Sequence, residues 1–155
     1  MDRFVAAPLT VIVLALGLVA CGGDDAPSRA DFAADANEIC QNAENELQDV
    51  AQDASSPDEI AAAVDKVIDQ TQDSVDKLKD LERPEGADGE AAQKFVNALE
   101  TDIEDKGIPA LEDLRDALKE NDQQAAQKAA QRLQAIQTTN SDRLARDVGA
   151  KSCAD

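Results

Sequence analysis

Two patterns of apolar and polar residues divide the chain. Residues 4–20 form a nearly unbroken apolar run, whereas from residue 30 onward apolar side chains recur every three or four positions. That spacing lines one face of an α-helix, and no stretch shows the sustained alternation typical of a half-buried β-strand. The pattern predicts four amphipathic helices, at about 31–54, 56–81, 90–120 and 122–148.

The ends of these segments carry helix-boundary signals. Asp31 and Asp122 are suitable N-cap residues, because a carboxylate can accept hydrogen bonds from the free amides of a first helical turn. Ser56 followed by Glu59 has the form of a capping box, in which each side chain bonds the other residue's amide. Gly149 is expected to stop the last helix.

Each segment has one stripe of residues that is expected to face a core. Asn140 is the one clear polar member of the fourth stripe. It is interpreted as fixing the register of the helices, as lining a ligand pocket, or as partly exposed. The predicted inward residues are Phe32, Ala36, Ile39, Ala43, Leu47, Val50 and Ala54; Ile60, Val64, Val67, Ile68, Thr71, Val75, Leu78 and Leu81; Ala92, Phe95, Leu99, Ile103, Leu111, Leu114 and Leu118; and Ala126, Ala129, Leu133, Ile136, Asn140, Leu144 and Val148.

Pro109 interrupts the third segment. Proline lacks a backbone donor and its ring crowds the carbonyl four residues earlier, here that of Asp105. Because the same apolar face resumes afterwards, we expect one continuing helix with a kink; two separate helices are the alternative.

Four such helices with short connections predict an all-α, up-down-up-down four-helix bundle over residues 30–155. Large apolar residues make up fewer than one in five positions after residue 20, which in a highly charged chain often indicates disorder. Here they lie on stripes, and abundant alanine favours helix. We therefore expect a folded bundle with a thin, alanine-rich core.

The amino-terminal residues 1–20 have the form of a secretory signal peptide, with Arg3 near the start, an apolar run and small residues at the end. Leu18-Val19-Ala20-Cys21 resembles the bacterial lipobox. The resemblance implies that the leader is cut before Cys21 and that Cys21 carries a diacylglyceryl group. The alternatives are an uncleaved membrane helix and a cleaved leader with a free thiol.

Residues 21–29 are rich in glycine and acidic side chains and are interpreted as a flexible tether. Lipid attached to Cys21 would hold the protein stably at a membrane, since each buried methylene contributes ~0.8 kcal/mol. The expected location is therefore outside the cytoplasm, anchored to the outer face of the cell membrane.

With Cys21 assigned to lipid, Cys40 and Cys153 remain. In an exported protein such a pair is expected to form a disulfide. The predicted helix lengths bring the end of the fourth helix to about the level of residues 35–36 of the first, within reach of Cys40. A buried free Cys40 and a reactive pair are the alternatives, although the Cys-x-x-Cys spacing of redox catalysts is absent.

Composition excludes several kinds of chemistry. The absence of His removes His-based nucleophile pairs and His-ligated metal centres. With 33 acidic and 15 basic residues and a net charge of −18, the chain is unsuited to binding nucleic acid. Asp102 and Asp105 belong to the densest acidic run and are interpreted as solvated helix surface. No catalytic, cofactor-binding or metal-ligating residue is predicted, and we expect no cofactor and a monomer.

The whole chain resembles the small Ala- and Asp-rich exported lipoproteins of actinobacteria. The matching features are Ile39-Cys40-Gln41-Asn42-Ala43, the turn at 78–84, the Leu-rich third helix and a terminal Gly-x-x-x-Cys at 149–153. The resemblance implies an envelope location and a helical fold, and it assigns no catalytic residue.

The expected function is that of a non-enzymatic, lipid-anchored envelope protein that acts through protein partners or envelope components. The alternative is a carrier of a small molecule or lipid, with an apolar cavity opened between the helices by Pro109 and small Ala side chains. An apolar cavity of a few hundred Å³ would favour the carrier, and a dense core without one would favour the interaction protein.

Overall fold

The structure is a computed structural model that describes residues 26–51 and 56–154. These residues form helices and turns and no β-strand, which confirms the predicted all-α class. The leader and Cys21 lie outside the described residues, as does the predicted end of the first helix at Ala54. In chain order the elements are α1 (Arg29–Ala51), α2 (Pro57–Asp80), α3 (Gly86–Asp102), the π-helical turn η1 (Ile103–Gly107), α4 (Ile108–Lys119), α5 (Gln123–Ala135), α6 (Thr139–Val148) and the 3-10 turn η2 (Lys151–Cys153).

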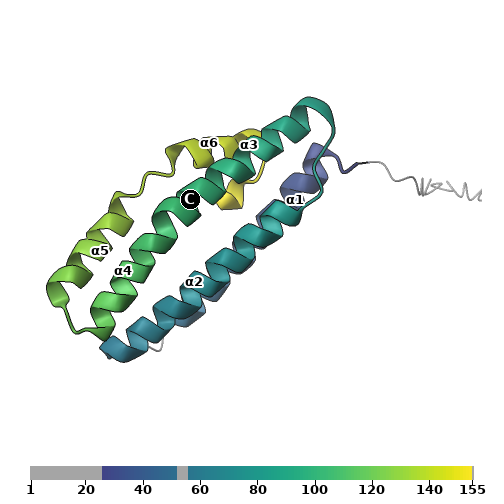
Figure 1. Ribbon diagram of the computed structural model, residues 1–155. Helices are drawn as coiled ribbons and strands as arrows, with labels where there is room; N and C mark the ends of the chain where they lie inside the picture. The colour runs from purple at the N-terminus through teal and green to yellow at the C-terminus, as the bar shows by residue number, and fades with distance from the viewer. Residues whose placement is uncertain (1–25, 52–55, 155) are drawn as a thin grey trace, which may run out of the picture.

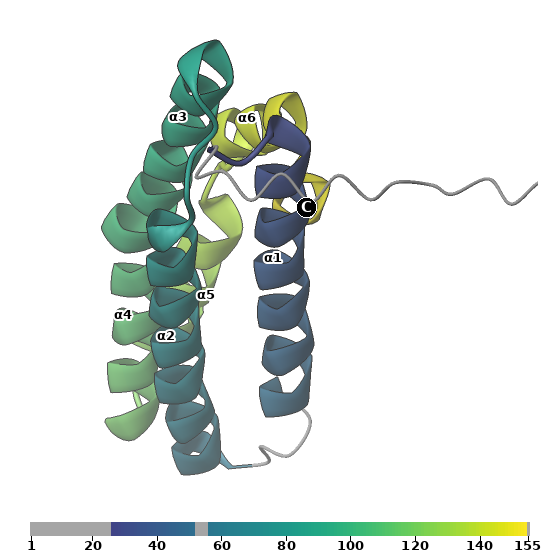
Figure 2. The same ribbon diagram turned by 90° about the vertical axis from the view of Figure 1, so that its right-hand side faces the viewer.

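The helices pack side by side along their lengths. α1 lies beside α2 (Figure 2), and α3 and α4 follow one another through η1 to form one long rod (Figure 1). The lower half of that rod packs on α2 and on α5, and its upper half packs on α6. The final turn η2 returns to α1, so that the carboxyl end of the chain lies beside the first helix (Figure 2).

Two of the three predicted N-caps are confirmed and one is wrong. Ser56 and Glu59 form the capping box, with the Glu59 amide 3.3 Å from Ser56 Oγ and the Ser56 amide 2.9 Å from Glu59 Oε2. Asp122 Oδ1 accepts from two first-turn amides of α5. Asp31 does not cap α1: the helix begins earlier, and Asp31 instead accepts a hydrogen bond from Ser28 Oγ at 2.6 Å.

At Pro109 the rod stays continuous, in agreement with the one-helix interpretation. The backbone widens just before the proline, and the Ile108 amide donates to the Ile103 carbonyl five residues back. This wider turn lets the helix pass a residue that has no amide hydrogen and whose ring needs space on its N-terminal side.

The predicted fourth helix is wrong as a single element. α5 ends at Ala135 and α6 begins at Thr139, with an extended backbone at Ile136 between them. Thr138, Thr139 and Asn140 all have weak helix propensity, which favours a break there. After the break a different face points inward, so Ser141, Ala145 and Val148 are the buried residues of α6.

Asn140 is consequently exposed, and its Oδ1 accepts a hydrogen bond from Arg143 at 3.3 Å. The prediction of a core position for Asn140 is wrong, because the break rotates the helix that follows it. The stripe of α2 is also rotated slightly: Ala61 and Ile68 are buried, whereas Ile60 is 38% exposed. Val67 is only partly buried.

The apolar core is thin, as predicted, and it is divided into two clusters. The larger cluster joins α1, α2, α3, α6 and the carboxyl end of the chain, and its buried members are Phe32, Ala36, Leu78, Ala92, Phe95, Val96, Ala145, Val148, Ala150 and Ala154. The smaller cluster joins α2 to α4 through Val64, Ile68 and Ile108. Half of the larger cluster is alanine, so its helices approach closely and bury little area per residue.

Candidate functional site

An apolar groove lies between α1, α2 and the rod formed by α3 and η1, with a volume of about 510 Å³. The α1 side contributes Ala43 and Leu47, and the α2 side contributes Thr71 and Val75. Ile103 of the π-helical turn lines the wall contributed by the rod. The groove has the size of the clefts that usually hold small ligands.

The groove lies where the core is interrupted. On α2, Ile68 belongs to the smaller cluster and Leu78 to the larger one, and Thr71 and Val75 lie between them. Ile103 lies likewise between the apolar residues of α3 and those of α4. The space that a continuous core would fill is thus left as an apolar hollow open to one side.

Cys40 and Cys153 form the disulfide expected from the sequence, with a Cα–Cα distance of 5.3 Å. Both residues also line the groove, so the disulfide is part of its wall. The sequence alone predicted the disulfide but gave no sign that the two cysteines lie beside a groove.

Hydrogen bonds hold η2 against α1 next to the disulfide. Asn37 Nδ2 donates to the Gly149 carbonyl at 3.1 Å, and Asn37 Oδ1 accepts from the Ser152 amide at 2.8 Å. Gln41 Nε2 donates to Ser152 Oγ at 3.0 Å. Gly149 adopts a left-handed φ of 93° that turns the chain from α6 into η2, which confirms its predicted role as a stop. These contacts fix the upper wall of the groove.

Among residues 26–51 and 56–154, Glu44 is the one charged residue that lines the groove. It lies on α1 one turn beyond Cys40 and just before Leu47, on the helix face that borders the hollow. Its side chain is exposed, and its Oε1 accepts a hydrogen bond from Gln48 at 3.2 Å. The groove therefore combines an apolar floor with a single carboxylate at the rim.

Away from the groove, a buried polar cluster lies at the junction of α3 and η1. Asp102 is 8% exposed, and its Oδ2 accepts a hydrogen bond from Ser141 Oγ at 2.6 Å, while its Oδ1 accepts one from Lys106 Nζ. Burial alone would raise the pKa of Asp102, but the hydrogen bonds from Lys106 and Ser141 outweigh burial and lower it. The interpretation of Asp102 as solvated surface is wrong, whereas Asp105 is exposed as expected.

A signal for Asp102 was present in the sequence. Phe95, Leu99 and Asp102 continue a spacing of four and then three residues, which places all three on one helix face. Ser141 carried no comparable signal, because the break before α6 changes which residues face inward.

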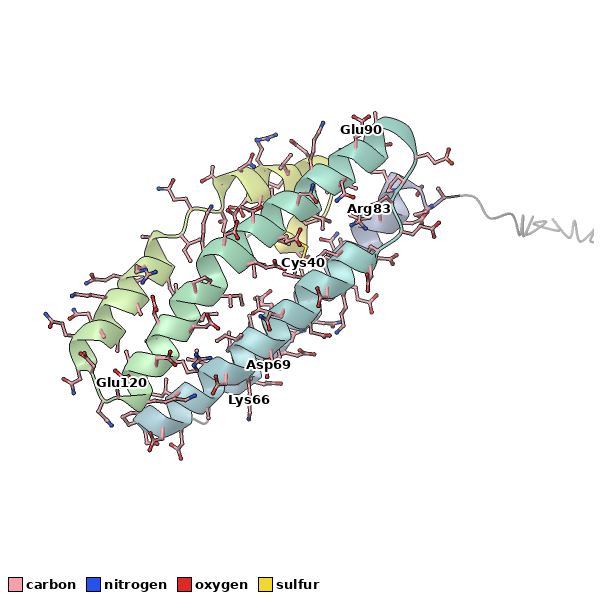
Figure 3. All side chains as sticks on the ribbon, in the orientation of Figure 1. Cys40, Lys66, Asp69, Arg83, Glu90 and Glu120 are labelled. Atoms are coloured by element: carbon pink, nitrogen blue, oxygen red, sulfur yellow. A yellow bond between two sulfur atoms is a disulfide. The ribbon has the colours of Figure 1, made fainter. Side chains whose placement is uncertain are left out.

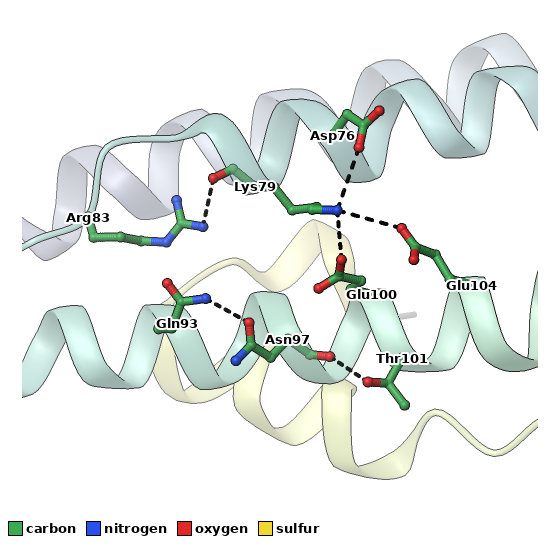
Figure 4. Close-up of polar contacts among 8 residues, drawn as sticks. All are labelled: Asp76, Lys79, Arg83, Gln93, Asn97, Glu100, Thr101 and Glu104. Carbon is green, nitrogen blue, oxygen red and sulfur yellow. Dashed lines mark hydrogen bonds and ion pairs between the residues drawn. The ribbon is translucent and has the colours of Figure 1, made fainter.

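Outside the groove, Lys79 ties α2 to the rod, as Figure 4 shows. Its Nζ lies 2.6 Å from Glu100 and 3.7 Å from Glu104. Arg83 continues this contact by donating to the Lys79 carbonyl at 3.0 Å. Hydrogen bonding to Glu100 raises the pKa of Lys79. The pairs are partly exposed, so they orient α2 and α3 more than they stabilise them.

Charged side chains project outward over the helices, as Lys66, Asp69, Glu90 and Glu120 illustrate (Figure 3). Within residues 26–51 and 56–154, no helix combines the length and apolar character needed to cross a membrane. No protein-family model matches the chain, and no curated protein or solved structure is detectably similar to it.

Proposed function

We propose that this protein is a non-enzymatic, exported carrier that holds a small apolar molecule in the groove beside the Cys40–Cys153 disulfide. The groove is the observation that carries the proposal. Its volume of about 510 Å³ and its mostly apolar lining support a carrier rather than a protein that acts only through its surface.

The packing around the groove supports the proposal. Leu47, Leu99 and Ile103 are only half-buried, because they all face the same open hollow. Each buried apolar side chain is worth ~1.5–3 kcal/mol, so leaving three of them partly hydrated costs stability. A ligand that covers them would recover that free energy.

The anchoring and topology belong to the same proposal. A lipid on Cys21 would attach the protein to the outer face of the membrane, and the tether would carry the groove above the lipid surface as a monomer. We propose that α1, α2, the α3–α4 rod and the α5–α6 pair correspond to the four helices of an up-down-up-down bundle. The resemblance to the Ala- and Asp-rich actinobacterial lipoproteins agrees with this arrangement.

A neutral fluorescent probe, N-phenyl-1-naphthylamine, tests the carrier function. We expect saturable binding and an increased melting temperature in its presence. Leu47→Gln should weaken binding at least tenfold, because it places an amide on the groove wall.

Leu133→Gln makes the same change at a half-buried leucine of α5 that does not line the groove, and it should leave probe binding unchanged. If the probe does not bind at all, or binds Leu47→Gln as tightly as the natural sequence, the carrier proposal fails.

A second candidate function is recognition of a protein or envelope partner by the acidic surface. The net charge of −18 supports it, because a surface of one sign favours association with basic partners. Chemical crosslinking of the anchored protein in the envelope tests this second function. If it is correct, a partner should be captured, and its capture should decrease as the salt concentration rises. The carrier proposal predicts a co-purifying small molecule instead.

A further inference from the structure

We propose that the ligand of the groove is a cationic amphiphile, with an apolar body on the groove floor and a positively charged head at Glu44. This inference rests on the proposed carrier function and adds the chemical class of the ligand. It is argued from the charges around the groove.

The floor selects for an apolar body. Leu47, Val75, Leu99 and Ile103 line the hollow with side chains that contain only carbon and hydrogen. Ser74 Oγ donates to the Gln70 carbonyl at 2.8 Å, within its own helix. A polar body would lose its bonds to water and find few partners on this floor.

The rim selects for a positive head. Within the part of the chain that the structure describes, Glu44 takes part in no ion pair and its one side-chain partner is the neutral amide of Gln48. Lys77 of α2 is paired with Asp73 at 2.6 Å. The carboxylate is therefore available to a charge from outside the protein.

Anionic heads are disfavoured at the same place. No Lys or Arg of the described ranges lines the groove, so a carboxylate, sulfate or phosphate head would meet Glu44 without a cation there to compensate. The net charge of −18 adds a repulsive field over the whole surface, although salt shortens its range to ~8–10 Å. Fatty acids and acidic phospholipids are thus poor ligands by charge.

Three probes with one tail and different heads separate these cases: decyltrimethylammonium, decyl maltoside and decyl sulfate. Each displaces N-phenyl-1-naphthylamine at concentrations below its micelle formation, with the helical circular dichroism signal recorded to verify that the fold persists. We expect the ammonium probe to bind about fivefold more tightly than the maltoside, as one partly screened ion pair provides, and the sulfate to bind most weakly.

Glu44→Gln should remove this preference, leaving the affinity for the maltoside unchanged and lowering that for the ammonium to the same value. Glu112→Gln is the matched control: it removes one charge from an exposed site on α4 and should keep the preference. Raising the salt concentration should reduce the preference in the natural sequence and in Glu112→Gln, and should have no effect on the head preference in Glu44→Gln.

The inference is overturned if the sulfate binds as well as the ammonium, or if Glu44→Gln and Glu112→Gln behave alike. Binding of all three probes without any head preference contradicts this inference and leaves the carrier function standing. Absence of displacement by any decyl probe overturns this inference, whereas absence of N-phenyl-1-naphthylamine binding itself overturns both this inference and the carrier function.

Discussion

Ser141 Oγ lies 2.6 Å from Asp102 Oδ2, and this contact joins α6 to the end of α3 across the interior. Ser141 is fully buried and Asp102 nearly so. A buried carboxylate is tolerated only when its charge and lone pairs are satisfied, and here Ser141 and Lys106 do so together. This contact helps to fix the position of α6, because α6 is short and the segment before it is not helical.

Asp102→Ala should destabilise the protein by ~2 kcal/mol, because it leaves the buried Ser141 hydroxyl without its charged acceptor and removes the ion pair with Lys106. Asp105→Ala, three residues further on and exposed, should change stability by less than ~0.5 kcal/mol. Urea unfolding followed by circular dichroism measures both. Equal effects of the two substitutions would contradict the account of Asp102 as a buried, bonded carboxylate.

Asp102 should also contribute to acid sensitivity. Its pKa in the folded protein is lowered below the ordinary 3.8, because the hydrogen bonds from Lys106 and Ser141 outweigh the effect of burial. A lowered native pKa means that the contribution is fully present above the unfolded-state value and is lost as pH falls through the native one. The difference in unfolding free energy between the natural sequence and Asp102→Asn should therefore be constant from about pH 5 to 8. It should shrink below about pH 4. A difference that stays constant to pH 2 would exclude this linkage.

The disulfide should make a large contribution to a bundle with so thin a core. Cys40 and Cys153 are separated by 113 residues in sequence, and cross-links across loops of this order contribute ~4–5 kcal/mol in the chain-entropy model. Dithiothreitol should lower the urea midpoint of the natural protein strongly. The double substitution Cys40→Ser and Cys153→Ser should already have the low midpoint and show no response to reductant. Two free thiols in protein isolated from an oxidising compartment would contradict the bridge.

Gly89 in the first turn of α3 should not tolerate alanine. A Cβ atom at this position would lie 2.0 Å from the Pro84 carbonyl oxygen, so the backbone of the preceding loop would have to move. Gly89→Ala should therefore destabilise the protein, although Gly→Ala within a helix ordinarily stabilises it by ~0.5–1 kcal/mol. Gly107→Ala is the control, because its Cβ would lie 3.7 Å from the nearest atom. Thermal unfolding of the two variants should give shifts of opposite sign.

Lipid attachment is tested at Cys21. Metabolic labelling with a fatty-acid analogue should label the natural protein, and Cys21→Ser should abolish the label and release the protein from the membrane fraction. Cys40→Ser should keep the label, which separates loss of the acceptor thiol from a general effect of losing a cysteine. Label that persists in Cys21→Ser would contradict the lipobox assignment.

The features that could be predicted from sequence are those decided within one helix or by one residue pair. Ser56 and Glu59 form their capping box from contacts three residues apart, and the cysteine pair followed from counting. The break at 136–138 was missed because weak helix formers rarely outweigh an apolar stripe that continues on both sides. An apolar space between helices was predicted only as part of the alternative function. The groove depends on how α1 packs relative to α2 and α3, which the sequence pattern of one helix does not determine. Glu44 gained significance only once those helices placed it at a rim.

Ile103 and Ile108 are five residues apart in a stripe that otherwise advances by three or four. In an α-helix one residue corresponds to a rotation of ~100°, so the π-helical turn acts as a one-residue insertion that restores the phase of α4. Deleting a single residue from 104–107 would leave the two isoleucines four residues apart, so a regular α-helix would keep Leu111 and its successors facing α2. The π-helical turn thus absorbs the surplus residue just before the proline, and Ile103 and Leu111 pack against the same small cluster from either side of it.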